Sequence, residues 1–217
     1  HNLRAIIHEK PFAGLNGSGK HNNWSMATTE GKNLLSPGQN PMENLSFLTF
    51  FINVIAAINK YAGLLRASIS NAGNDYRLGA NEAPPAIISV FTGDKLGGIL
   101  DAFMNGEKYV VDDKAILNLN LDKIANIERD DTDRNRTSPF PFTDNRFEFR
   151  AVGSSVNVSN PMTVLNTIVA DQLTDFKNSV ENARNNNESI EETIKSELRK
   201  VLKESKNIIF NGNNYSA

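Results

Sequence analysis

The chain has 217 residues, of which 39% are hydrophobic and 22% charged, as in a soluble globular protein rather than a disordered one. This length suits one large domain or a domain with an appendage. The net charge of −2 lacks the basic excess of proteins that bind nucleic acid or anionic membranes, so we expect neither as a partner. Having no cysteine, the chain excludes disulfides and thiolate chemistry, which fits a cytoplasmic protein.

The first motif of interest is a glycine-rich turn. An apolar run at 3–12 predicts a strand, and Asn16-Gly17-Ser18-Gly19 follows it. Glycine permits a positive φ, and successive backbone amides in such a turn can bind an anion. Lys20 adds charge and His21 is a possible metal ligand. On composition alone, an exposed hairpin turn leading to a second strand at 24–28 is the simpler interpretation.

A long apolar helix is predicted next. Asn40 at the N-cap, Pro41 at the first helical position and Glu43 at the third predict a helix that runs to about Ala62. Its apolar stretch, Leu45 to Ile58, is short for a bilayer span and contains Asn53, so we expect a buried core helix. The residues predicted to share its buried face are Phe47, Phe51, Val54 and Ile58.

The middle of the chain contains an acidic residue before two prolines. Glu82 precedes Pro84 and Pro85, which restrict the backbone before a predicted strand at 86–91. Glu82 is therefore either an ordinary exposed loop acid or a residue held on a stiff loop at the mouth of a site. A short helix is predicted at 96–105, and 106–133 has the mixed pattern of an insertion.

The second motif is the alternating segment Arg146-Phe147-Glu148-Phe149-Arg150. In a strand, its two arginines and its glutamate share one face while the phenylalanines point into a core. One interpretation is an exposed salt-bridge ladder, worth only about 0–1 kcal/mol. The other is a cleft floor, in which the glutamate holds a divalent cation and the arginines clamp a carboxylate or phosphate. The pattern alone does not separate the two.

Two helices are predicted after this segment. Asn160-Pro161 repeats the cap pattern of the first helix, and Ser189-Ile190-Glu191-Glu192 is a capping box. Asn185-Asn186-Asn187 interrupts the apolar pattern between them. We therefore expect one domain at 1–183 and a helical extension at 184–217. The predicted buried stripes are Val164, Leu165, Ile168, Val169, Leu173 and Phe176 in the first helix, and Ile190, Ile194, Leu198, Val201 and Leu202 in the second.

Several of these motifs together resemble one enzyme family. The run from Glu9 to His21 resembles the signature of glutamine synthetases, and its continuation to Ser25 resembles their large type III branch. Glu82-Ala83-Pro84, Asn135 to Phe140 and Arg146 to Arg150 are similar to further family motifs. The resemblance extends over roughly 3–175.

The resemblance implies a fold and an activity. The fold class is α+β: a curved antiparallel sheet with flanking helices, of the glutamine synthetase catalytic-domain type, plus C-terminal helices. The reaction joins ammonia to glutamate at the expense of ATP, through γ-glutamyl phosphate and with Mg²⁺ or Mn²⁺. The full-length enzymes assemble into homo-oligomeric rings.

It also implies roles for particular residues. His21 and Glu148 would bind the metal, and Glu82 would close the site over the acyl phosphate. Arg150 would hold the substrate carboxylate or the transferring phosphoryl group. The remaining implied roles are glutamate binding by Asn16, Gly17 and Arg77, and ATP binding by Asn23, Ser25, Arg134 and Arg136, with Arg136 also catalytic.

Two other protein classes remain possible from the sequence, and the chain is expected to be only part of a glutamine synthetase. A guanidino phosphotransferase has a related architecture but normally a reactive cysteine, which is absent here. A noncatalytic glutamine-synthetase-like module that assembles or binds regulators is the second alternative. Because the family takes further metal carboxylates and an ammonium-binding aspartate from regions with no counterpart here, we expect the chain to be a fragment that makes no glutamine alone.

Overall fold

The computed structural model describes residues 2–5, 7–81, 83–109, 116–117, 127–128, 138–184 and 189–212. Its main sheet has the strand order β1-β6-β5-β2. These strands are β1 (Gly19–Trp24), β2 (Val90–Phe91), β5 (Phe140–Thr143) and β6 (Arg146–Gly153). The β1–β6 and β5–β6 pairs are antiparallel, whereas β2 joins β5 in parallel. The α+β class is therefore confirmed, with a mixed rather than wholly antiparallel sheet. A separate two-stranded pair consists of β3 (Ile116–Leu117) and β4 (Ile127–Glu128).

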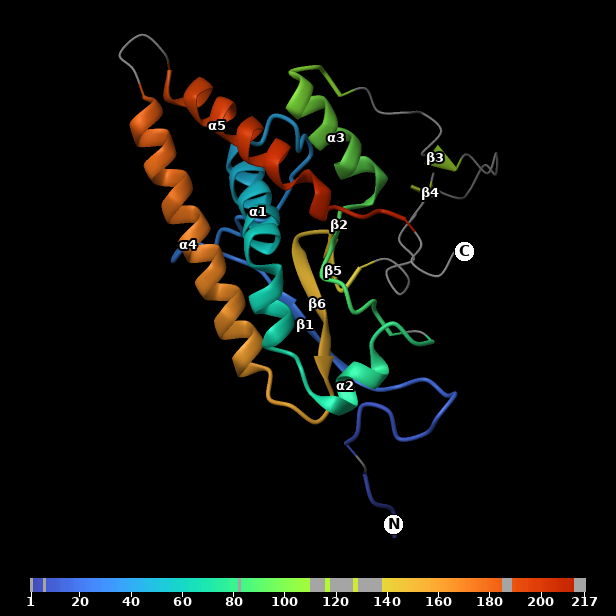
Figure 1. The fold of residues 1–217 in the computed structure, drawn as a ribbon. Coiled ribbons are helices and arrows are strands. Elements are labelled where there is room, and N and C mark those ends of the chain that lie inside the picture. The colour runs from blue at the N-terminus through green and yellow to red at the C-terminus, as the bar shows by residue number, and fades with distance from the viewer. Residues whose placement is uncertain are drawn as a thin grey trace.

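The helices are α1 (Leu45–Ala67), α2 (Ala72–Arg77), α3 (Gly93–Asn105), α4 (Ser159–Ala183) and α5 (Ile190–Ser205), followed by a 3-10 turn, η2 (Lys206–Ile208). In Figure 1, α1 lies beside the sheet, and α4 and α5 pack along α1. The N-terminal segment extends away from α4 and α5, on the side of the molecule where α2 lies (Figure 1).

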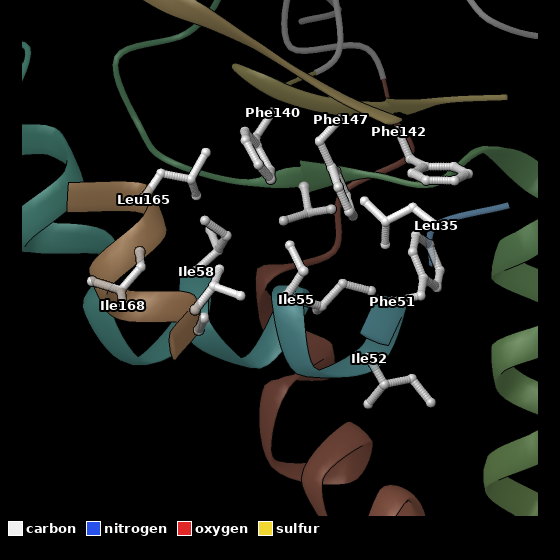
Figure 2. Close-up of a cluster of buried hydrophobic side chains, with 14 of the residues drawn as sticks. Leu35, Phe51, Ile52, Ile55, Ile58, Phe140, Phe142, Phe147, Leu165 and Ile168 are labelled. Atoms are coloured by element: carbon white, nitrogen blue, oxygen red, sulfur yellow. The ribbon is translucent and has the colours of Figure 1, made fainter. Parts of the chain in front are cut away.

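The core forms where α1 meets β5 and β6. Figure 2 shows Phe51 and Ile55 of α1 directed toward Phe140, Phe142 and Phe147 of the strands. The Phe51 and Phe142 rings meet edge to face with centroids 4.7 Å apart, and the Phe140 and Phe147 rings stack at 4.7 Å. Aromatic pairs of this kind add about 0.5–1.5 kcal/mol each beyond the area they bury. Leu165 and Ile168 of α4 complete the cluster (Figure 2).

Helix α1 is the buried core helix that its sequence predicts, although by length and hydropathy it would also pass for a membrane span. Its one deeply buried amide, Asn53, is fully enclosed. The Asn53 Nδ2 atom donates to the Thr49 carbonyl (2.8 Å), and Oδ1 accepts from Gln172 of α4 (3.1 Å). These two bonds offset the cost of burying the amide, which ties α1 to α4.

The start of α1 differs from the prediction. Residues 41–43 form a turn, and Asn44 is the N-cap, its side chain accepting from the Phe47 amide (3.1 Å). The Asn40 carbonyl instead accepts from the amides of Glu43 and Asn44. Two asparagines four residues apart both satisfy the local rule for a cap, and the one whose side chain reaches a free amide begins the helix. The helix continues past Gly63 to Ala67.

Three strand predictions and one cap also need correction. No described residue between 2 and 18 is in a strand, and Leu3 is 90% exposed. The strand predicted at 24–28 lies earlier, as β1, and the one predicted at 86–91 contains only Val90 and Phe91. Pairing, not apolarity, decides where a strand forms. Helix α4 begins at Ser159 without a side-chain cap from Asn160.

The C-terminal helix follows its predicted pattern. The Ser189 hydroxyl accepts from the Glu192 amide (3.3 Å), which is one of the two bonds of a capping box. The Glu192 side chain accepts from Lys195 (3.0 Å). Leu198 and Leu202 are buried against the core of α1, whereas Ile190 at the first turn is 47% exposed. The predicted helix at 96–105 is confirmed as α3, which begins three residues earlier. In the predicted stripe of α4, Leu165, Ile168, Val169 and Phe176 are buried.

Candidate functional site

Pairing of β1 with β6 brings together residues that are more than 120 positions apart. Asn23 lies opposite Glu148, and Trp24 opposite Phe147. Phe147 and Phe149 are completely buried, and Ala151 is 1% exposed. The period-two alternation predicted for β6 therefore holds from Arg146 to Phe149, and the other face of this stretch carries the polar residues Arg146 and Glu148. It does not extend to Arg150, which was expected to face a cleft with them but is 2% exposed.

His21 and Glu148 meet on this polar face. The His21 Nδ1 and Glu148 Oε1 atoms are 2.9 Å apart, and the two side chains are 46% and 13% exposed. Burial is the main influence on His21 and lowers its pKa. Glu148 opposes this shift, whereas the positive charges of Arg150 and Arg77 add to it. Because the net shift is downward, the imidazole is neutral at pH 7, the form that can coordinate a metal ion.

A register shift sets the position of His21. Lys20 pairs with Val152 but Asn22 pairs with Phe149, so His21 faces a stretch of β6 that has one additional residue. Such irregularities redirect side chains next to functional sites. Lys20 is held by a bond from its ammonium group to the Val156 carbonyl, in the turn that follows β6.

Arg77 and Arg150 are buried close to His21. Arg77, at the end of α2, is 4% exposed, and its guanidinium donates to the carbonyl oxygens of Arg150 (3.2 Å) and Val152 (3.4 Å) and to Asn74 Oδ1 (3.1 Å). Arg150 is 2% exposed. The three charged residues of β6 therefore differ in depth: Arg146 is exposed, Glu148 is partly buried and Arg150 is enclosed.

The sequence of the glycine-rich turn allows anion binding, but in the structure its glycines make room for the Arg77 side chain. A Cβ atom at Gly19 would overlap the Arg77 guanidinium, and one at Gly17 would lie 2.9 Å from Arg77 Cγ. Neither glycine has a positive φ. Their small size, not their conformational freedom, is what the fold uses: Arg77 approaches the backbone at Gly19, and the Glu9 carbonyl and Arg77 both approach it at Gly17.

Residues predicted to contact the nucleotide lie farther along the polar face. The Asn23 Oδ1 atom accepts from Arg146 Nε (3.3 Å). The Ser25 hydroxyl contacts Asn33 Oδ1 (2.8 Å) and the Asn145 carbonyl (3.2 Å) of the β5–β6 turn. Asn16 is exposed in the loop before β1. Glu82, Arg134 and Arg136 lie outside the described residues.

Sequence inspection missed two buried polar residues in this region, Glu9 and Asn74. Asn74 is completely buried and donates to the carbonyl oxygens of Ile69 (2.9 Å) and Ala151 (2.8 Å), so it joins α2 to β6. Glu9 bonds to Ser155. The only sequence indication for Glu9 was its place as a lone acid beside an apolar run, within the glycine-rich motif.

The chemical types of the donor groups on this face suit a divalent cation. A neutral imidazole and a carboxylate at contact distance suit Mg²⁺ or Mn²⁺. Within the described parts of the chain, no group of three or more His, Asp or Glu side chains could hold a metal ion. His21 and Glu148 can therefore supply two ligands, which is fewer than such an ion requires.

Comparison with known proteins identifies the family. No family model matches the chain. Over its whole length it is 48% identical to a glutamine synthetase of Bacteroides fragilis (strain YCH46), 46% to a type-3 glutamine synthetase of Dictyostelium discoideum and 45% to a glutamine synthetase of Butyrivibrio fibrisolvens. The chain spans 29–30% of the length of these relatives. From this full-length similarity, together with an α+β fold, we conclude that the chain belongs to the glutamine synthetase family.

Proposed function

We propose that this chain forms part of the active site of a glutamate–ammonia ligase. In this reaction, the γ-carboxylate oxygen of glutamate attacks the γ-phosphorus of ATP and ADP leaves. Ammonia then attacks the acyl carbon of γ-glutamyl phosphate and phosphate leaves. The observation that carries the proposal is the His21–Glu148 contact of 2.9 Å on the polar face of the sheet, with two guanidinium groups close to it.

His21 and Glu148 are the proposed metal ligands of this chain. A bound Mg²⁺ or Mn²⁺ would neutralise phosphate charge during the transfer. The β1–β6 pairing holds both side chains in place before any ligand arrives, which removes the entropic cost of assembling them. The depressed pKa of His21 keeps a lone pair available at neutral pH.

The arginines are proposed to recognise the anionic groups. Arg77 is fixed by two carbonyl oxygens of β6, so its charge stays beside the turn that carries Asn16 and Gly17. This arrangement favours a role with the carboxylates of glutamate. Arg150 lies deeper, where a fixed charge stabilises developing negative charge more strongly than it would in water. Glu82 would close the site, and Arg134 and Arg136 would meet ATP phosphates.

The same proposal extends to the whole protein that contains this chain. We propose a cytoplasmic homo-oligomeric ring that uses glutamate, ammonia and ATP. Asn23 and Ser25 would contact the nucleotide from the end of the polar face, where both side chains are exposed.

The test is glutamine formation by the full-length protein that contains this chain, with ATP, glutamate, ammonia and Mg²⁺. His21→Ala and Glu148→Gln should each lower kcat by about 10²–10³, the usual effect of removing one electrostatic stabiliser. Mn²⁺ affinity, followed by electron paramagnetic resonance, should fall at least about tenfold. The control is Glu30→Gln, which removes an exposed carboxylate outside the site.

Each outcome of this test is informative. Absence of glutamine with the wild-type protein would contradict the ligase proposal and favour a noncatalytic module. Unchanged Mn²⁺ affinity in both site variants would show that these two residues do not hold the metal ion. A thermal shift with ATP and Mg²⁺ in the wild type would confirm that the protein used in the assay binds nucleotide.

A further inference from the structure

Glu9 is buried in a segment that is otherwise exposed. Among the described residues from 2 to 16 it is the only one in the core, with 3% of its surface accessible. The apolar neighbours Leu3, Phe12 and Leu15 are 90%, 64% and 60% exposed. Carboxylates are seldom buried unless they are paired, so this inversion of the usual pattern requires a specific cause.

The Glu9 carboxylate is buried because groups from three parts of the chain surround it closely. Glu9 Oε1 accepts from the backbone amide of Ser155 (3.0 Å) and from its hydroxyl (2.5 Å). A Cβ atom at Gly73 would lie 2.6 Å from Oε2, and one at Gly153 would lie 2.5 Å from Oε1. The groups that surround the carboxylate therefore come from the start of α2, the end of β6 and the turn after β6. Burial raises the pKa of Glu9, but the two bonds from Ser155, a bond from its own backbone amide and the charge of His8 together outweigh burial, so the net pKa is lowered.

The backbone of Glu9 closes the loop that leads to β1. The Ser18 amide donates to the Glu9 carbonyl (2.8 Å), so both ends of the loop between them are joined. Inside the loop, Asn81 Nδ2 donates to the Leu15 carbonyl (2.6 Å). Gly17 packs against the Arg77 side chain, as the 2.9 Å separation of a built Cβ atom from Arg77 Cγ shows. Moving Glu9 would therefore move the contact surface of Arg77.

We propose that Glu9 is a positioning residue: its buried carboxylate anchors the loop 10–18 so that Gly17 is held against Arg77, with Asn16 next to it in the loop, before substrate binds. The carboxylate acts through the loop and touches no substrate. The part of this inference that concerns glutamate rests on the proposed function, whereas the anchoring of the loop does not.

The experiment uses the full-length protein with Glu9→Ala, Glu9→Gln and Ser155→Ala. The control is Glu197→Gln, which changes another buried carboxylate, 8% exposed and bonded to Lys200 on α5. Hydrogen exchange at the Ser18 amide measures loop anchoring without requiring activity. Steady-state kinetics give KM for glutamate and for ATP at a temperature at which thermal scans show every variant to be folded.

In Glu9→Ala we expect the Ser18 amide to exchange at least about tenfold faster. KM for glutamate should rise about 10- to 100-fold, with KM for ATP unchanged. Glu9→Gln keeps an acceptor for Ser155, so it and Ser155→Ala should show smaller changes in the same direction. They also decide the matter if Glu9→Ala fails to fold. The Glu197→Gln control should alter neither quantity.

Two results would overturn the inference: unchanged Ser18 exchange in the folded Glu9 variants, or equal rises of both KM values. If the wild type makes no glutamine, the proposed function fails by itself, and hydrogen exchange still tests the anchor.

Discussion

At Gly19 the backbone of β1 and the side chain of Arg77 occupy adjoining space, so one methyl group can separate them. A Cβ atom there would overlap the guanidinium, which is held by the carbonyl oxygens of Arg150 and Val152. Because these bonds fix the arginine, relief would require breaking at least one of them. The position therefore links a backbone requirement to a charge that acts on His21.

Gly19→Ala should lower the free energy of unfolding by about 1–3 kcal/mol, the usual cost of overpacking a closed site. Urea denaturation of the purified protein measures it. Gly63→Ala is the matched control, since a Cβ at Gly63 meets no atom within 4 Å and the residue lies inside α1. The control should be neutral or more stable by about 0.5–1 kcal/mol. Equal stability of the Gly19 variant and wild type would show that Arg77 is not held as described.

Among the elements, α3 depends on a side chain from the far end of the chain. Its own N-cap residue, Thr92, makes no side-chain capping bond. Asn211 supplies the cap instead, with Oδ1 accepting from the amides of Thr92 (2.9 Å) and Gly93 (3.2 Å). The adjoining backbone joins the sheet edge, where the Phe210 amide donates to the Val90 carbonyl (2.8 Å). The segment after η2 thus completes both α3 and the β2 edge.

Asn211→Ala should therefore cost about 0.5–2 kcal/mol of unfolding free energy, the range for loss of a cap. Hydrogen exchange should accelerate at the Thr92 and Gly93 amides, while amides in α4 keep their protection. Asn207→Ala, an exposed asparagine on η2, serves as the control and should change neither measurement. If Asn211→Ala leaves the two amides protected, the cap comes from another group.

At the scale of helices and strands, the features that could be predicted are those that depend on residues close together in the sequence. The alternation at 146–149 in β6 and the Ser189 N-cap follow from local geometry, and the structure contains both. The burial of Arg150 does not follow from the alternation, because it depends on what packs over the strand. The strand at 3–12 was wrong because a strand depends on a pairing partner, which apolarity cannot supply. The start of α1 was displaced because Asn40 and Asn44 both satisfy the local cap rule.

In the candidate site, too, some residues could be predicted from the sequence and others could not. His21 and Glu148 were predicted from their motifs, and the β1–β6 register brings them together. The buried Glu9 was not predictable, since its partners Gly73, Gly153 and Ser155 are distant in sequence and individually ordinary. Their relation to Glu9 exists only after the sheet, α2 and the following turn have packed together.

For the molecule as a whole, the question is whether 217 residues suffice for the proposed ligase reaction. The described residues offer His21 and Glu148 to one ion, and no larger group of His, Asp or Glu side chains that could hold a metal ion occurs among them. Phosphoryl transfer depends on charge neutralisation around the moving group. The chain spans 29–30% of the length of its relatives, so it holds a fraction of the sequence from which they build a site.

The isolated 217-residue chain should therefore make no measurable glutamine. Loss of a single electrostatic stabiliser costs about 10²–10³ in rate, and the described residues place no third His, Asp or Glu ligand beside His21 and Glu148. Biosynthetic and γ-glutamyl transferase assays on the purified chain test this, with the full-length protein as control and circular dichroism to confirm that the chain is folded. Weak ATP–Mg²⁺ binding can persist, because the paired His21 and Glu148 are set by strands within the chain. Turnover within about tenfold of the full-length protein would contradict this prediction, because these 217 residues would then contain the complete catalytic set.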